Sequence, residues 1–159
     1  MKTVLITGGT VRLGKAIAER LRAEGWRVIT SSHRADAGAD IVADLAESMG
    51  AAKLYAATLQ MLGGNPPDAL VNNAALFTGD AAAIKAVNLE APKKLTMLMA
   101  GRETGVGAIV NILDTKALDA SRRLPTPISP PSASSPPLRV RAPRPLPRHC
   151  ASMALRRVR

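Results

Sequence analysis

Residues 1–14 read MKTVLITGGTVRLG, and this stretch decides the fold of the 159-residue chain. Its apolar run at residues 3–6 contains β-branched side chains and predicts a short buried strand. Two glycines, Gly8 and Gly9, then interrupt the run before residues 15–24 predict a helix. Apolar residues four positions apart mark the predicted buried face of that helix: Leu13, Ile17 and Leu21.

A glycine-rich turn between a buried strand and a helix is suited to binding a phosphate. It brings free backbone N–H groups and the positive end of the helix dipole to one point. Glycines are needed there because side chains would keep the backbone away from a pyrophosphate. Taken alone, the stretch also allows a tight turn without any ligand. The remainder of the chain decides between these two interpretations.

Strand and helix signals alternate along residues 1–120. Short apolar runs predict four further strands, at residues 27–31, 41–42, 69–71 and 108–113. A helix is predicted over residues 47–62, with an interruption at Gly50. Another is predicted over residues 81–99, capped by Asp80 and kinked or broken by Pro92. This alternation predicts an α/β fold: a Rossmann-like, doubly wound parallel sheet, incomplete at about five strands, with its first strand central.

Polar or glycine-rich segments follow each predicted strand. They lie at residues 7–14, 32–34, 44, 73–75 and 114. In an open parallel sheet, ligands bind beyond the carboxyl ends of the strands. Five such segments at one edge therefore predict a ligand site much more strongly than the glycine turn does alone.

The composition divides the chain near residue 120. Residues 1–120 carry 13 Lys and Arg against 12 Asp and Glu, whereas residues 121–159 carry nine Arg and no acidic residue. Nine of the 12 prolines also lie in residues 121–159. We therefore expect a folded domain at 1–120, which carries the predicted ligand site, and a disordered Pro/Arg-rich tail at 121–159. No apolar run is long enough for a membrane span, and the single Cys150 is consistent with a reducing, cytoplasmic location.

Several segments between residues 3 and 114 carry a resemblance to a known family. They are TGGTVRLG at 7–14, ADL at 43–45, NNAA at 72–75, VNLEAP at 87–92 and NILD at 111–114. In these segments the chain resembles the short-chain dehydrogenase/reductase family, and within it the pteridine-reductase branch. Arg12 stands where most members have a glycine, and Asp114 stands where most have the catalytic serine; both are typical of that branch.

The resemblance implies which residues line the site. Those that would bind the cofactor are Gly8, Thr10, Arg12, Leu13, Gly14, His33, Arg34, Asp44, Leu45, Asn73, Ala74 and Ala75. Those that would act on a small-molecule substrate are Asn88 and Asp114. No metal is implied. Plain structural roles stay open for some of them: a solvated charge for Arg34, a helix cap for Asp44, and ordinary polar positions for Asn73 and Asn88.

The end of the second predicted strand favours NADP(H) over NAD(H). NAD-binding sites of this kind hold the ribose hydroxyls with an acidic residue near that strand end. Residues 31–34 read SSHR and contain no carboxylate. The forked guanidinium of Arg34 suits a 2′-phosphate, and Arg12 adds positive charge from the turn.

The resemblance also implies an oxidoreductase acting on a pteridine or a related carbonyl or imine compound. Such enzymes need a tyrosine, with a lysine four residues later, on the helix after the fifth strand. The chain has a single tyrosine, Tyr55, which we expect to be structural, and no lysine after Lys116. We therefore expect the chain as written to be inactive. The intact family enzyme would be a homo-oligomer.

Residues 121–159 have two competing explanations. One is a genuine basic tail, which makes the alternative function a non-catalytic dinucleotide-binding module that contacts nucleic acid through charge. The other, which we favour, is a shifted reading frame that truncates the enzyme. Codons compatible with residues 125–132, read from their third base, can encode Tyr-Thr-Tyr-Leu-Ser-Ala-Lys, which contains the missing Tyr-x-x-x-Lys pattern. The coding sequence around codons 114–135 distinguishes the two.

Overall fold

The computed structural model describes residues 1–101, 107–113 and 155–157, the last of these as backbone only. Apart from Leu113, all of these residues belong to one compact unit. Asp114 and most of the segment 121–159 lie outside the described residues, so the expectations for them stay predictions.

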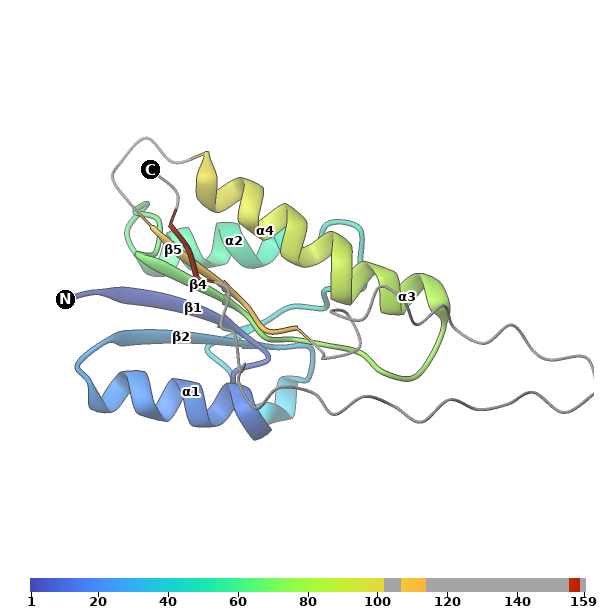
Figure 1. Ribbon diagram of the computed structural model, residues 1–159, viewed down its shortest axis with the longest axis horizontal. Coiled ribbons are helices and arrows are strands. Elements are labelled where there is room, and N and C mark those ends of the chain that lie inside the picture. The colour runs from blue at the N-terminus through green and yellow to red at the C-terminus, as the bar shows by residue number, and fades with distance from the viewer. Residues whose placement is uncertain (102–106, 114–154, 158–159) are drawn as a thin grey trace, which may run out of the picture. The chain divides into compact units, whose positions relative to one another are not determined.

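The described residues form a six-stranded sheet (Figure 1). Its strands are β1 (Thr3–Thr7), β2 (Arg27–Ser32), β3 (Ile41–Val42), β4 (Ala69–Asn72), β5 (Ala108–Asn111) and β6 (Leu155–Arg157). The order is β3-β2-β1-β4-β5-β6, and the first five strands pair in parallel. This confirms the Rossmann-like sheet of five parallel strands with the first strand among the central ones.

The sixth strand is not predicted by the sequence, which indicates only a disordered tail in that region. Here β6 pairs antiparallel with β5, with Ile109 opposite Arg156. Without β6, the outer edge of β5 would leave backbone N–H and C=O groups unpaired. An extended segment can satisfy these groups whatever its side chains are.

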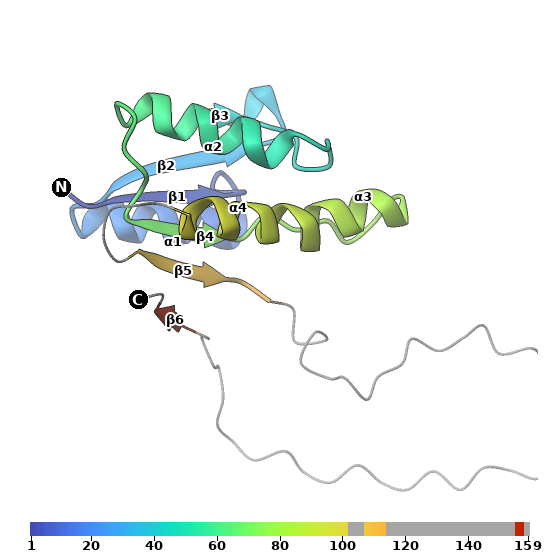
Figure 2. The same ribbon diagram turned by 90° about the horizontal axis from the view of Figure 1, so that it is seen from above.

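Helices cover both faces of the sheet. Figure 1 shows α1 (Arg12–Ala23) on one face, with α2 (Gly50–Met61) and α4 (Ala91–Ala100) on the other. Figure 2 shows α2 and α4 over the same face, where they contact each other. The alternating side chains of β1 serve both layers: Leu5 faces α2 and α4, whereas Val4 and Ile6 face α1. Each face therefore has its own apolar core, as a doubly wound sheet requires.

Helix α1 differs from its prediction in where it begins and in the exposure of Leu13, whereas Ile17 and Leu21 pack against the core as predicted. It starts at Arg12 rather than at residue 15, and its buried residues are Gly14 and Ala18. Leu13, expected on the buried face, is 52% exposed. The difference has a steric cause, because a Cβ at Gly14 would collide with the carbonyl oxygen of Gly8. The helix approaches the sheet through its small residues, which turns Leu13 outward.

Helix α2 begins at Gly50, so the prediction that Gly50 interrupts a helix starting at residue 47 is wrong. A Cβ at Gly50 would collide with the carbonyl oxygen of Asp44, so only glycine lets the chain enter the helix here. Tyr55 is 8% exposed and packs in the core with Leu54, as a structural role requires.

The segment predicted as one helix with a disturbance has three parts: α3 (Ala81–Lys85), a π-helical turn η2 (Ala86–Glu90) and α4. Asp80 caps it as predicted, since its Oδ2 accepts hydrogen bonds from the amides of Ala82 and Ala83 at 3.0 and 3.2 Å. The π-helical turn ends at Glu90, two residues before Pro92. Proline lacks an N–H and crowds the carbonyl four residues earlier, and the wider turn relieves this. No helix within the described ranges has the length and apolarity needed to cross a membrane.

Candidate functional site

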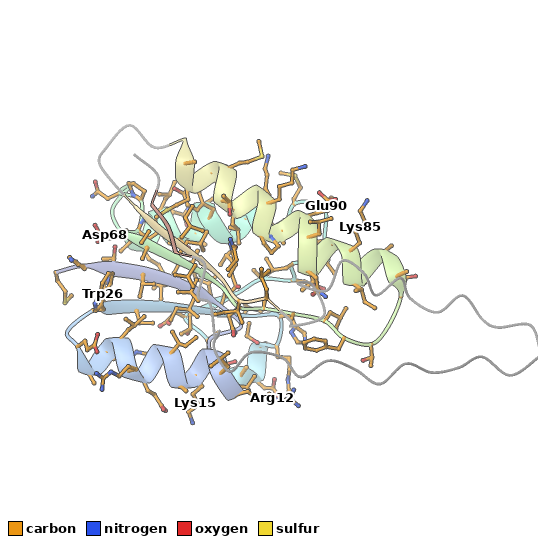
Figure 3. The ribbon with its side chains drawn as sticks, in the orientation of Figure 1. Arg12, Lys15, Trp26, Asp68, Lys85 and Glu90 are labelled. Carbon is orange, nitrogen blue, oxygen red and sulfur yellow. The ribbon has the colours of Figure 1, made fainter. Side chains whose placement is uncertain are left out.

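The parallel register brings the carboxyl ends of the strands to one edge of the sheet. Thr7 at the end of β1 lies opposite Ser31 in β2, and Asn72 at the end of β4 lies opposite Asn111 in β5. Figure 3 shows Arg12 beside this edge, whereas Trp26 and Asp68 lie at the opposite end of the sheet. The predicted site segments that the structure describes therefore follow strands that end on the same side.

The glycine turn is tightly packed at three positions. Gly8 has a φ of +63°, which glycine adopts without strain. A Cβ at Gly9 would lie 2.7 Å from Cγ2 of Thr30, and one at Gly14 would lie 2.5 Å from Nδ2 of Asn73. The backbone can follow this path only without side chains at these positions. Gly9 was not among the predicted site residues, although the pair of adjacent glycines was the available signal.

The N-terminus of α1 has no side-chain cap. Its N-cap residue is Val11, whose side chain accepts no hydrogen bond. The amides of the first turn, at residues 12–14, therefore meet no capping side chain and lie at the positive end of the helix dipole. Thr10 is half-buried and Leu13 exposed beside them. The close-packed glycines together with an uncapped helix start suit a bound diphosphate.

Thr7 joins the turn after β1 to the segment after β4. Its hydroxyl accepts hydrogen bonds from the amides of Asn73 and Ala74, both at 3.0 Å, and donates one to the carbonyl of Val71 at 3.5 Å. Thr7 is 2% exposed, so this network is shielded from water. Thr7 lies within the predicted site segment 7–14 but was not named individually as a cofactor-binding residue; the signal for it is a threonine directly before the first glycine of the turn.

The side chain of Asn73 joins the same two segments, this time from the segment after β4 to the backbone of the glycine turn. Its Nδ2 donates to the carbonyl oxygens of Thr7 and Gly8, both at 3.0 Å. Ala74 packs so closely that its Cα would lie 3.1 Å from a Cβ at Gly8, while the following Ala75 is exposed. The structure thus brings the predicted residues Asn73 and Ala74 against the glycine turn, and it gives Asn73 a positioning role there.

The predicted cationic residues differ in their surroundings. Arg34 forms two contacts with the carboxylate of Asp36, from Nε at 2.9 Å and from Nη2 at 2.6 Å. This hydrogen-bonded pair raises the pKa of Arg34 and lowers the pKa of Asp36, and both side chains are exposed. Asp36 lies in the 3₁₀ turn η1 (Ala35–Ala37), two residues beyond the stretch in which we found no carboxylate. Its effect on Arg34 was therefore missed.

Arg12 has no ion-pair partner among the described residues, and its φ is +48°. A side chain in this left-handed region is strained, which is why a glycine suits the position. His33 is exposed directly before Arg34. The edge of the sheet therefore presents one unpaired guanidinium, at Arg12, and one paired guanidinium, at Arg34.

The two residues after β3 have mainly local roles. Asp44 is exposed and its Oδ1 accepts a hydrogen bond from the amide of Ala46 at 2.8 Å, which forms a tight turn. Leu45 is 7% exposed and its side chain packs in the core on the α2 side of the sheet. Any contact of this segment with a ligand would come from its backbone or from the Asp44 side chain.

Asn88 lies in η2 and holds the segment after Ala75. Its Nδ2 donates to the carbonyl of Leu76, and its Oδ1 accepts from the amide of Leu76, both at 2.8 Å. The side-chain amide is thus engaged at both ends with the backbone, so its visible role is to position this segment. Asp114, the other predicted catalytic residue, lies outside the described residues.

Asn72 has a buried side-chain oxygen near the end of β4. Its Nδ2 donates to Oδ1 of Asn111 at 2.8 Å, while its own Oδ1 is buried and accepts no hydrogen bond from the described residues.

The described residues also bear on metal binding. Among them, no group of three or more His, Cys, Asp or Glu side chains is arranged to hold a metal ion.

Comparisons with known proteins agree with this geometry. Residues 4–120 match the model of the NAD dependent epimerase/dehydratase family. The serine 3-dehydrogenase of Rhizobium radiobacter is 38% identical over 90 residues, which are 51% of this chain and 36% of that protein.

Solved structures that are similar to the chain include the following two. The 3-alpha-hydroxysteroid dehydrogenase from Pseudomonas sp. B-0831, complexed with NADH, is 32% identical with a TM-score of 0.56, covering 62% of this chain and 38% of that one. FolM alternative dihydrofolate reductase 1 from Brucella suis, in complex with NADP, is 30% identical with a TM-score of 0.60, covering 71% and 57%. The chain therefore spans little more than a third to somewhat over half the length of these relatives.

Proposed function

Because the chain belongs to the NAD dependent epimerase/dehydratase family, we propose that it derives from an NADPH-dependent oxidoreductase of the short-chain type. The observation that carries this proposal is the glycine turn tied to β4 by Thr7 and Asn73, beside the uncapped start of α1. A dinucleotide is the ligand whose diphosphate needs such a cradle.

Each part of a bound dinucleotide can be assigned to residues at the carboxyl-end edge of the sheet. The amides at residues 12–14 would hold the diphosphate, and the segment after β4, at 73–75, would lie against the sugar and nicotinamide. The exposed Asp44 would lie near the adenine. When bound, the nicotinamide supplies hydride chemistry. The chain's own residues bind and orient the nucleotide and, through the pair of hydrogen bonds from Asn88 to Leu76, fix the segment that lies next to it.

The choice of NADPH over NADH rests on the two arginines at the edge. Arg12 carries an unpaired charge, and Arg34 follows the end of β2, where a 2′-phosphate would lie. The FolM relative is described in complex with NADP, which supports this choice, while the hydroxysteroid dehydrogenase is described with NADH. A pteridine or related carbonyl or imine substrate is proposed on the same resemblance to reductases.

We propose further that the chain as written lacks the family reaction. Its only tyrosine, Tyr55, is buried in the core and far in sequence from the helix that follows β5 in the family pattern. Without a general acid, a bound substrate would not be protonated as it is reduced. The alternative of a nucleic-acid-binding tail rests on residues 121–159, and no described feature favours it.

Titration of the full chain with NADPH, followed by nicotinamide fluorescence, tests the proposal. We expect saturable binding and no turnover. An Arg12→Ala variant should bind NADPH about two- to fivefold more weakly, as expected for an exposed charge contact. Arg20→Ala, further along the same helix and paired with Glu24, is the matched control and should leave binding unchanged.

A folded chain that binds neither NADPH nor NADH would overturn the proposal. Binding of both with equal affinity would retain the oxidoreductase family assignment and overturn the preference for NADPH. Reduction of a pteridine or carbonyl compound at a rate above background would overturn the proposed inactivity.

A further inference from the structure

The carboxylate of Asp36 occupies the Nε/Nη2 edge of the Arg34 guanidinium, which is one of the two edges that can bind a phosphate at two points. Both carboxylate oxygens are engaged, one with Nε at 2.9 Å and the other with Nη2 at 2.6 Å. This is the two-point geometry by which a guanidinium binds carboxylates and phosphates alike. A 2′-phosphate must therefore displace Asp36 or take the remaining edge of the guanidinium, close to a negative charge.

The loop holds Asp36 in this position. The hydroxyl of Ser32 accepts a hydrogen bond from the amide of Arg34 at 3.1 Å, and Gly38, with a φ of +65°, ends the turn η1. The pair is thus local, two residues apart within a short ordered turn, and forms without help from a distant element.

The other carboxylate of this loop is engaged elsewhere. Asp40 accepts hydrogen bonds from the amide and the hydroxyl of Thr30, both at 2.7 Å, and its remaining ion contact is with Arg22 at 3.9 Å. Asp36 is consequently the acidic residue that offsets the charge of Arg34. The charges of Arg34 and Asp36 therefore offset each other toward an approaching phosphate.

We infer that Asp36 is a specificity-determining residue that weakens the preference of this site for nucleotides with a 2′-phosphate. The inference rests on the proposed function. A nucleotide with a free 2′-hydroxyl has no phosphate for Asp36 to compete with, so Asp36 affects one cofactor class and not the other. Asp36 therefore lowers the ratio by which the site prefers NADPH over NADH.

Adenosine 2′,5′-bisphosphate and AMP are suitable probes because they differ only in the 2′-phosphate. Calorimetric titration of the full chain should show that Asp36→Asn tightens the bisphosphate about two- to fivefold, as removal of one nearby screened charge predicts, and leaves AMP unchanged. Glu24→Gln is the matched control. It removes the same charge from an exposed pair with Arg20 at 2.8 Å, at the other end of α1, and should change neither affinity.

Two further measurements separate this role from a general change in charge. In an Arg34→Ala background the effect of Asp36→Asn should vanish, because the competition is for Arg34. At about 1 M salt it should shrink toward none, since screening then acts within a few ångströms. Weaker or unchanged bisphosphate binding in Asp36→Asn, equal tightening of AMP, or persistence without Arg34 would overturn the inference. If the wild-type chain binds NADH and AMP, such a failure leaves the proposed function standing; binding of neither cofactor nor either probe overturns both.

Discussion

Thr7 is the residue on which the geometry of the site depends most. Its buried hydroxyl satisfies two amides that follow β4 and reaches a third backbone group in the strand itself. A residue at the end of a strand is often assigned a role in that strand alone. Here the Thr7 hydroxyl also determines where the segment after β4 lies relative to the glycine turn.

Replacement of Thr7 by valine keeps the shape of the side chain and removes its hydroxyl. Two partly buried amides then lose their acceptor, and we expect the free energy of unfolding to fall by about 1–3 kcal/mol. Urea denaturation measures this. Thr7→Ser keeps the hydroxyl and should cost at most about 1 kcal/mol for the lost methyl group. Equal losses in the two variants would show that packing, not the hydrogen bonds, is responsible.

Arg12 combines a strained backbone with an unpaired charge. We expect Arg12→Gly to raise the free energy of unfolding by about 1 kcal/mol, because glycine adopts a φ of +48° without a Cβ penalty. The same variant should bind NADPH more weakly. Arg12→Lys keeps both the strain and the charge and serves as the control. Stability measured by urea denaturation that stays unchanged or falls in Arg12→Gly would contradict the strain argument.

At the scale of elements, one proline and one helix cap determine the path of the segment from α3 to α4, which lies next to the candidate site. Asp80 starts the helix, Pro92 imposes the π-helical turn, and that turn carries Asn88 to Leu76. A regular helix would rotate Asn88 away from this position, since every later residue would shift around the axis.

The cap at Asp80 is testable by itself. Asp80→Ala leaves the amides of Ala82 and Ala83 without their acceptor and should lower the free energy of unfolding by about 1 kcal/mol. Hydrogen exchange of the same two amides should become faster. Asp80→Ser retains an acceptor oxygen and should lose much less. An Asp80→Ala chain as stable as the wild type would mean that α3 is held by its packing alone.

Most of the parallel sheet could be predicted from the sequence, because β1, β2, β4 and β5 are short runs of apolar residues bounded by glycine, proline or asparagine. The helix starts were harder. Both Gly14 and Gly50 lie where the backbone approaches another carbonyl, and a propensity scale treats such glycines as helix breakers. Only the tertiary contact reverses that preference.

The site was also predicted only in part, because the contacts that complete it depend on tertiary structure. The glycine turn was identified from its place between a strand and a helix, and Asn73 from its place after a strand and from the family resemblance. The structure brings them together. The pairing of Arg34 with Asp36 was missed because our interpretation stopped at the strand end, whereas the η1 turn folds the next acidic residue back. The two hydrogen bonds between Asn88 and Leu76 depend on a π-helical turn, which has no simple sequence signature.

At the scale of the whole molecule, ligand binding and folding should be coupled. A nucleotide that binds the folded chain alone stabilises it by about 2.7 kcal/mol at one hundred times its dissociation constant. We expect NADPH to raise the urea midpoint of the full chain accordingly. AMP at the same multiple of its own dissociation constant is the control and should give an equal shift. A saturating concentration of NADPH without any shift would mean that the nucleotide also binds the unfolded chain.

The hydrogen bonds between Thr7 and Asn73 join positions 66 residues apart in the chain. The nucleotide cradle therefore cannot assemble from the N-terminal glycine motif alone during synthesis; it has to wait until β4 has emerged from the ribosome and paired with β1. Closure of so long a loop is among the slower events in folding. A nascent chain that has not yet exposed Asn73 and Ala74 would thus carry the whole glycine motif and still be unable to bind nucleotide. The onset of binding would mark the moment at which β1 and β4 pair.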